Sequence, residues 1–177
     1  MEIDDINILK ETIPDRPFIL AIAGGTASGK TTFTHALSVD SQIQDQITVL
    51  GMDNFYIGCP EGVNADDYDF DHPSSLDFDA INKCLRDLLI HKETQMPLYD
   101  FKTHKPSGKF ETLKCKDILI FEGIMSLYDE KIRNIFDLKL FVLCDSDVAL
   151  ARRILRDIKD RGRDVNEVLT RYNKFIK

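Results

Sequence analysis

The sequence predicts one α/β domain built on a doubly wound parallel sheet with helices on both faces. Apolar runs of strand length at residues 18–23, 47–50, 118–121 and 139–144 alternate with segments that have helical spacing. Strands separated by helices pair in parallel, which is the α/β arrangement. Residues 1–17 form a lead-in, because two prolines stop any helix before the first strand. A chain of 177 residues suits a single core, so the whole chain is expected to be one domain.

Composition and charge exclude several classes of protein. Hydrophobic residues make up 43% of the chain and charged residues 30%, which is ordinary for a globular protein. The formal net charge of −7 repels phosphate backbones and anionic lipids, so we expect neither nucleic acid nor membrane as a partner. The four cysteines form no C-x-x-C pair, which argues against a zinc site and fits a reducing compartment. No apolar run is long enough to span a bilayer and no signal peptide is evident, so we expect a cytoplasmic protein.

Residues 24–31 match G-x-x-x-x-G-K-[ST], the pattern of a phosphate-binding loop. An apolar strand run precedes the loop and residues 32–39 can continue as a helix, which is the order that such loops require. Glycines allow several backbone N–H groups to face one polyphosphate, Lys30 adds a positive charge, and Thr31 offers a hydroxyl group to Mg²⁺. The residues expected to bind the nucleotide are Gly24, Gly25, Thr26, Ala27, Ser28, Gly29, Lys30, Thr31 and Thr32.

Two carboxylates follow buried strand runs. Asp53 comes just after the second run, at the carboxyl edge where open α/β sheets bind ligands. A lone aspartate after a strand more often caps a turn, but the neighbouring Phe55 and Tyr56 favour a site. Glu122 ends the third run and is followed by glycine, a pattern expected for an acid that reaches Mg²⁺ beside a phosphate-binding loop. An acid that merely leads into a helix is the alternative for Glu122.

The segment between the second and third strand runs combines a loop, a helix and a hairpin. Aromatic rings alternate with carboxylates at residues 68–73, which suits a pocket that stacks a flat ligand; an acidic surface loop is the alternative. Asp77 caps a helix with core-facing apolar residues at i, i+4, i+7 and i+8 from Ile81. Residues 96–114 form a small hairpin whose return strand is expected at 110–113, and its prolines exclude a central strand. The histidine of this hairpin is either a surface residue or one that addresses a base edge.

Residues 145–165 contain a charged helix, expected at 147–160, and an Arg-Gly-Arg sequence. Arginine–aspartate pairs at i and i+4 are typical of a solvated helix face. Arg153 and Arg156 nevertheless lie on one face, and guanidinium groups are preferred for gripping transferring phosphates, so we expect an Arg-rich helical lid over 145–165. The arginine–aspartate pairs of this helix at i and i+4 are Arg153 with Asp157 and Arg156 with Asp160.

A further short helix is expected at 126–133, before the last strand run.

These motifs together resemble the uridine kinase family, also called uridine–cytidine kinases, over the stretch from about Pro17 to Lys177. The resemblance implies a P-loop NTPase-type fold, with the hairpin as an insertion that binds the base. It also implies transfer of the γ-phosphoryl group of ATP, with Mg²⁺, to the 5′-hydroxyl of uridine or cytidine in pyrimidine salvage, and assembly as a homo-oligomer, a tetramer. Besides the loop, the matching motifs are Asp53-Asn54-Phe55-Tyr56, Phe70-Asp71-His72-Pro73, Pro97-Leu98-Tyr99-Asp100-Phe101 with His104, Phe121-Glu122-Gly123-Ile124, and residues 152–157 leading to Arg161-Gly162-Arg163.

The same resemblance implies a role for each matching side chain. Asp53 is similar to the base that accepts the proton of the 5′-hydroxyl, and Thr31 and Glu122 are similar to the residues at Mg²⁺. Asp71 and Arg153 look like the residues that hold the ribose hydroxyls. The pyrimidine pocket would consist of Tyr56, Phe70, Tyr99, Phe101 and His104. The groups that neutralise the transferring phosphate would be Lys30, Arg156, Arg161 and Arg163.

The chain departs from the family pattern at two places. Family members commonly carry an arginine two positions after the hairpin histidine, whereas here His104 is followed by Lys105-Pro106. The family usually continues beyond the position of Lys177, so a C-terminal segment of the family is expected to be missing. Two alternatives remain: a P-loop kinase for another small hydroxyl acceptor, which the aromatic hairpin disfavours, and a catalytically silent nucleotide-binding module.

Overall fold

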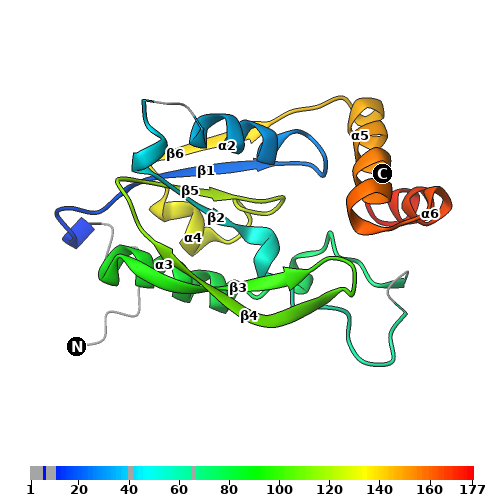
Figure 1. Cartoon of the computed structure of the whole chain (residues 1–177), viewed down its shortest axis with the longest axis horizontal. Helices are drawn as coiled ribbons and strands as arrows, with labels where there is room; N and C mark the ends of the chain where they lie inside the picture. The colour runs from blue at the N-terminus through cyan, green and yellow to red at the C-terminus, as the bar shows by residue number, and fades with distance from the viewer. Residues whose placement is uncertain (1–5, 7–10, 40–41, 65–66) are drawn as a thin grey trace.

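The computed structural model describes residues 6, 11–39, 42–64 and 67–177. In this part of the chain four parallel strands form the main sheet, in the order β2-β5-β1-β6 (Figure 1). The parallel α/β prediction is therefore confirmed, whereas most of the lead-in expected at residues 1–17 lies outside the described residues. The strands are β1 (Phe18–Gly24), β2 (Ile47–Gly51), β5 (Ile118–Glu122) and β6 (Leu138–Val142).

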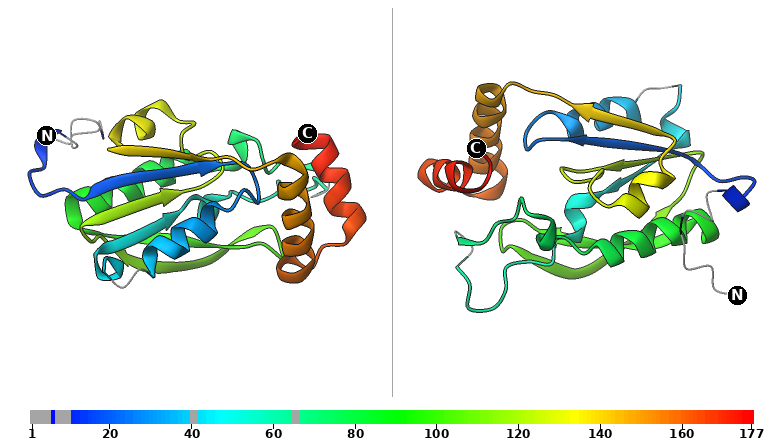
Figure 2. Two further views of the ribbon diagram at one scale, coloured as in Figure 1. Left: turned by 90° about the horizontal axis from the view of Figure 1, so that it is seen from above. Right: turned by 180° about the vertical axis from the view of Figure 1, so that it is seen from behind.

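Helices cover both faces of the sheet, as the doubly wound prediction requires. Leu20 of β1 belongs to a cluster that packs against Leu37 of α2 (Lys30–Ser38). Ile19 belongs to a larger cluster on the other face, which α3 (Phe78–His91) and α4 (Glu130–Ile135) complete. Because side chains alternate along a strand, neighbouring residues of β1 supply the two layers. Most of the core lies between the sheet and the α3–α4 layer (Figure 2).

Aspartates begin both helices of the larger core. The Oδ1 atom of Asp77 accepts a hydrogen bond of 2.8 Å from the backbone N–H of Ala80, so the predicted cap of α3 is confirmed. Asp129 caps α4 in the same way. This helix begins four residues later than the helix expected at 126–133, because the buried Ser126 forms a turn instead and its hydroxyl donates to the carbonyl of Ile22 at 3.2 Å.

The hairpin forms a two-stranded antiparallel sheet of its own, from β3 (Glu93–Asp100) and β4 (Lys105–Lys114). Its exclusion from the main sheet is confirmed. The return strand is longer than the expected 110–113, because the turn comes earlier and pairs Asp100 with Lys105. The Asp100 carboxylate accepts the Lys102 N–H at 2.9 Å and His104 takes a positive φ of 56°, which together close the turn.

Two helices stand beyond the carboxyl end of the sheet, toward which β1 and β6 point (Figures 1 and 2). They are α5 (Ser146–Arg161) and α6 (Val165–Phe175). Gly162, with φ of 70°, ends α5, and Asp164 caps α6 by accepting two backbone N–H groups. The segment predicted to be a lid, residues 145–165, thus contains the expected helix, and a second helix that sequence analysis did not expect follows it; we call α5 and α6 the lid helices after that prediction. No helix in the described ranges is long and apolar enough to cross a membrane.

Candidate active site

A cavity of about 960 Å³ opens at the carboxyl end of the sheet, between the phosphate-binding loop, the hairpin turn and the two lid helices. Its size is that of a small-molecule site. Of the predicted site residues, those that line it are Thr26, Ala27, Gly29, Lys30, Thr31, Thr32, Asp53, Tyr56, Phe70, Asp71, Tyr99, Phe101, His104, Glu122, Arg153, Arg156, Arg161 and Arg163. Gly24, Gly25 and Ser28 lie in the loop but not on the cavity wall.

Left-handed backbone conformations shape the phosphate-binding loop. Ala27 and Gly29 have φ of 55° and 105°, and Gly29 caps α2, so the first turn of that helix opens to the cavity. A Cβ on Gly24 would lie 2.5 Å from the carbonyl oxygen of Val142, so only glycine fits there. The Ser28 hydroxyl is buried and has no hydrogen-bond partner within the described chain. The loop therefore fits a ligand with several anionic oxygens.

Lys30 supplies a buried positive charge to this loop. Its Nζ atom donates to the carbonyl of Gly25 at 2.8 Å. Burial lowers the pKa of the ammonium group, whereas the carboxylates of Glu122 and Asp53 act in the opposite direction. A bound polyphosphate would replace part of the solvation that the ammonium group has lost.

Thr31 of α2 and Glu122 of β5 meet as predicted for a metal site. The Thr31 hydroxyl lies 3.1 and 3.3 Å from the two carboxylate oxygens of Glu122. Burial raises the pKa of Glu122, and the nearby Asp53 acts in the same direction. Among the described residues, no group of three or more His, Cys, Asp or Glu could hold a metal ion. Two hard oxygen ligands fit Mg²⁺, which keeps several waters and commonly shares its site with substrate phosphates.

Asp53 lies on a short 3-10 helix, η2 (Met52–Phe55), directly after β2. Burial raises the pKa of its carboxyl group. Positive charges oppose this effect, and the strongest of them is Arg161, followed by Lys30. The carboxylate thus faces the cavity among cations, in a position that suits a proton acceptor.

The glycine after Glu122 makes room for η2. A Cβ on Gly123 would lie 2.4 Å from the Cβ of Met52, closer than any real contact of this kind. Because Met52 is adjacent to Asp53, a side chain at position 123 would displace the segment that carries that carboxylate. The Glu-Gly sequence therefore supplies both an acid and the space that a second acid needs.

Aromatic rings from three segments form a pocket at the other end of the cavity. The Tyr56 ring lies 5.4 Å from Tyr99, 6.1 Å from Phe70 and 6.5 Å from Phe101, measured between centroids. His104 stacks on Phe70 at 4.6 Å with 20° between the ring planes. Burial raises the pKa of Tyr99 to about 12, and its hydroxyl has no hydrogen-bond partner in the described part of the chain. The structure thus brings together the five side chains predicted to hold a flat base.

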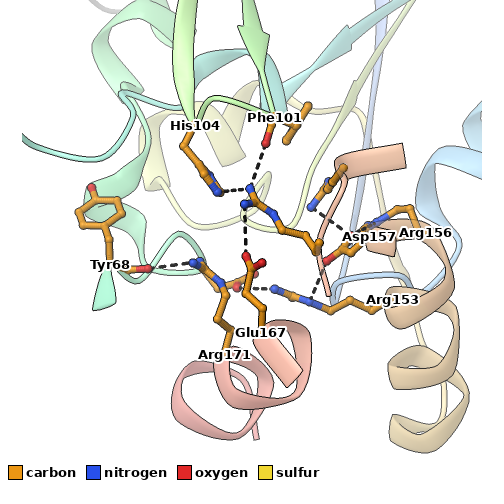
Figure 3. Close-up of polar contacts among 11 residues, drawn as sticks. Tyr68, Phe101, His104, Arg153, Arg156, Asp157, Glu167 and Arg171 are labelled. Carbon is orange, nitrogen blue, oxygen red and sulfur yellow. Dashed lines mark hydrogen bonds and ion pairs between the residues drawn. The ribbon is translucent and has the colours of Figure 1, made fainter. Parts of the chain in front are cut away.

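The buried face of α5 carries ion pairs that extend toward this pocket (Figure 3). Arg153 Nη2 lies 3.5 Å from Asp71 Oδ2, so the two residues predicted to hold ribose hydroxyls are adjacent. The interpretation of a solvated helix face is wrong here, because Arg153 and Asp157 are only 6% and 4% exposed. Arg156 pairs with Asp157, at 2.8 Å, and the expected partner Asp160 is exposed.

The two arginines of the Arg-Gly-Arg sequence face different surroundings. The guanidinium carbon of Arg161 lies 4.4 Å above the Phe101 ring, and burial lowers the pKa of the group. Arg163 faces the hairpin turn: it donates to the carbonyl of Phe101 at 3.0 Å and contacts Nε2 of His104. Its other terminal nitrogen lies 3.2 Å from Glu167. Arg163, predicted to act on phosphate, thus lies beside the aromatic pocket.

Sequence analysis missed several cavity residues on the two lid helices. Arg171 of α6 lies 5.1 Å above the Phe70 ring and donates to the carbonyl of Tyr68 at 3.3 Å. A signal for α6 was present, since Asp164 is followed three residues later by Glu167 within a run of helical apolar spacing. The missed residues are Arg152, Asp157, Glu167, Val168 and Arg171.

Comparison with known proteins gives a consistent result. The family model described as "Phosphoribulokinase / Uridine kinase family" matches residues 19–177. A chloroplastic uridine/cytidine kinase of Arabidopsis thaliana is 42% identical over 168 residues, which cover 93% of this chain and 34% of that protein. A uridine-cytidine kinase of Danio rerio is 39% identical over 173 residues, or 92% of this chain and 66% of the relative. The chain thus spans between a third and two thirds of the length of these relatives.

Solved structures share the fold. A possible uridine kinase from Bacillus stearothermophilus superposes with a TM-score of 0.61 at 23% identity, covering 90% of this chain and 92% of the other. A phosphoribulokinase from Rhodobacter spheroides gives a TM-score of 0.61 at 15% identity, covering 90% of this chain and 65% of the other. At these identities the likeness establishes the P-loop kinase fold and nothing finer.

Proposed function

This chain belongs to the phosphoribulokinase/uridine kinase family, and from that membership we propose that it transfers the γ-phosphoryl group of ATP to the 5′-hydroxyl of uridine or cytidine. The observation that carries the proposal is one cavity into which both the phosphate-binding loop and the aromatic pocket open, with Asp53 on its wall. Phosphoryl transfer needs the donor and the acceptor hydroxyl in line within one such space. The names of the Arabidopsis and Danio relatives favour a pyrimidine nucleoside as the acceptor.

The donor half of the site consists of the loop, Lys30 and the lid arginines. In the proposal the loop N–H groups and Lys30 hold the phosphates of ATP, and Arg156 and Arg161 neutralise charge that develops during transfer. Mg²⁺ would be held by Thr31 and Glu122, and when bound it neutralises phosphate charge.

The acceptor half consists of the aromatic pocket and the Asp71–Arg153 pair. The rings stack the base, and the ion pair hydrogen-bonds the ribose hydroxyls, so a 2′-deoxynucleoside would leave buried polar groups unpaired. Asp53 accepts the proton of the 5′-hydroxyl, which makes that oxygen a better nucleophile.

An acceptor panel tests this function. The purified chain is incubated with ATP, Mg²⁺ and either uridine, cytidine, 2′-deoxyuridine, a sugar phosphate or pantothenate, and the products are separated by ion-exchange chromatography. We expect monophosphates from uridine and cytidine and much less product from 2′-deoxyuridine. Product from a sugar phosphate or pantothenate alone would identify another acceptor class. ATP binding without product from any acceptor would contradict a kinase activity.

Assembly and location are further parts of the proposal. The family resemblance supports a homotetramer and a cytoplasmic location, although one of the relatives named above is chloroplastic. The native mass, measured against the chain mass of 20.3 kDa, tests the tetramer directly.

A further inference from the structure

Asp157 is the acid around which three of the arginines of α5 are arranged (Figure 3). Its Oδ2 atom lies 3.5 Å from Nε of Arg153, and its Oδ1 atom accepts a hydrogen bond of 2.8 Å from Nε of Arg156. The same Oδ1 atom lies 3.4 Å from Nη1 of Arg161. One carboxylate therefore contacts three arginines that line the cavity.

The backbone of Asp157 fixes a fourth arginine. Its carbonyl oxygen accepts the N–H of Gly162, the left-handed residue that ends α5, and the N–H of Arg163 at 3.1 Å. These bonds close the helix and begin the turn that brings Arg163 to the contact with His104. The side chain and the backbone of a single residue thus contact four of the cavity arginines.

Burial makes this arrangement depend on charge. Asp157 is 4% exposed, and a carboxylate removed from water in this way needs cationic partners. Burial lowers the pKa of Arg161, the positive charge of Arg156 acts in the same direction, and Asp157 opposes both, so the carboxylate favours the charged form of that guanidinium group.

The three arginines reach different halves of the cavity. Arg153 lies between two carboxylates, since its Nη2 atom is 3.5 Å from Asp71 Oδ2 on the acceptor side. Arg156 lies on the donor side, close enough to Lys30 to lower the pKa of that ammonium group. The Asp157 carboxylate is therefore the point at which the contacts of the two halves join.

We propose that Asp157 is a positioning residue, which holds the acceptor-side Arg153, the donor-side Arg156, and Arg161 above the Phe101 ring in fixed relative positions on α5. The inference rests on the proposed kinase function. Asp157 acts through the arginines and need not touch the reacting atoms. Its role is to align the ribose with the triphosphate, because both are gripped by side chains that share one anchor.

Asp157→Asn tests the role of the charge, with Asp160→Asn as the matched control, since Asp160 is an exposed acid on the same helix. Displaced arginines misalign the two substrates, and misplacement of about 1 Å costs roughly 100-fold in rate. We expect Asp157→Asn to lower kcat by about this factor and to raise KM for the nucleoside, while Asp160→Asn stays within about twofold of the parent chain. Asp157→Glu keeps the charge and should recover most of kcat.

A role in packing alone predicts a different pattern. Asp157→Asn and Asp157→Glu would then lose activity together, in proportion to a fall in the midpoint of thermal unfolding. That pattern would overturn the inference, and so would an Asp157→Asn variant with kcat and KM equal to those of Asp160→Asn. If Asp157→Asn does not fold, Asp157→Glu decides: near-parent kcat with near-parent unfolding supports the inference, and a loss of kcat proportional to destabilisation overturns it.

A measurement independent of activity separates this inference from the proposed function. The Nε–H proton of Arg156 is bonded to Asp157, so its NMR signal should exchange slowly with water in the parent chain and in Asp160→Asn, and rapidly in Asp157→Asn. Rapid exchange of the Arg156 Nε–H proton in the parent chain would overturn the inference that Asp157 holds Arg156 in place. Slow exchange in a parent chain that phosphorylates no nucleoside would refute the proposed function and leave the anchoring supported.

Discussion

Substitution of Asp53 by asparagine tests the catalytic centre most directly. Asparagine has nearly the same shape as aspartate but cannot accept a proton at neutral pH, so the change removes the proposed base and little else. The side chain lies on η2 with its carboxyl group toward the cavity, and its neighbours Gly123 and Met52 are unaffected. ATP binding should therefore be retained.

The expected loss of kcat depends on whether another carboxylate of the cavity is available to act as the base. A general base contributes about 10²–10⁴-fold in rate. The other carboxylates of the cavity already have partners: Asp71 has Arg153, Asp157 has three arginines, Glu122 has Thr31, and Glu167 has Arg163. Because each of them is engaged elsewhere, we expect the upper half of that range, about 10³–10⁴-fold in kcat, which is about 4 to 5.5 kcal/mol of transition-state stabilisation.

The assay measures kcat for uridine across pH, together with ATP affinity by equilibrium titration. In the parent chain the rate should fall as pH falls through the pKa of Asp53, because only the ionised carboxylate accepts a proton, and burial moves that fall to higher pH than for an exposed aspartate. Asp53→Asn should lack this fall. A kcat within tenfold of the parent value, or an unchanged pH profile, would refute the assignment of Asp53 as the base.

Three further substitutions test other parts of the site. Arg161→Met removes the strongest positive charge that opposes the raised pKa of Asp53, so that pKa should rise further. The pH at which kcat falls on acidification should therefore be higher than in the parent chain; an unchanged or lower pH would contradict this electrostatic explanation. Gly24→Ala should disrupt the loop and weaken ATP binding by at least about tenfold, because the added Cβ would lie 2.5 Å from the carbonyl oxygen of Val142. Gly25→Ala should be far milder, because its Cβ would meet no atom within 4 Å. Equal effects of the two substitutions would show that the contact with Val142 does not explain the need for glycine at position 24. Glu122→Gln should raise the Mg²⁺ concentration for half-maximal activity by about tenfold or more, and an unchanged Mg²⁺ titration would exclude it as a metal ligand.

The main sheet was predictable because its strands are continuous apolar runs that end in recognisable motifs. The core stripe of α3 was equally plain, since an Asp77 cap precedes apolar residues at helical spacing. Turn positions were harder. The hairpin turns near His104, so its return strand begins earlier than the expected residue 110, and α4 starts late because Ser126 bonds to a neighbouring strand. Such bonds join residues far apart in sequence, and local patterns do not contain them.

The candidate site was predictable in its membership and less so in its connections. Motifs identified Thr31 and Glu122 separately, and the parallel sheet brings them together because β5 lies beside β1, which leads into the loop. The same sequence spacing was compatible with both a solvated and a buried face of α5. Only the packing of α5 beside the hairpin and α6 decides that Asp157 is inside, and this packing depends on contacts between segments that the sequence does not reveal.

The contact between Gly123 and Met52 gives a way to sort related sequences. Because the clash at position 123 is with the Cβ of Met52, a smaller residue such as alanine at position 52 would not relieve it. Any homologue with a side chain at the position of Gly123 must therefore displace the segment that carries the Asp53 carboxylate, unless it has glycine at position 52. Loss of this glycine in a homologue should mark pseudoenzymes even where every residue that touches substrate is retained.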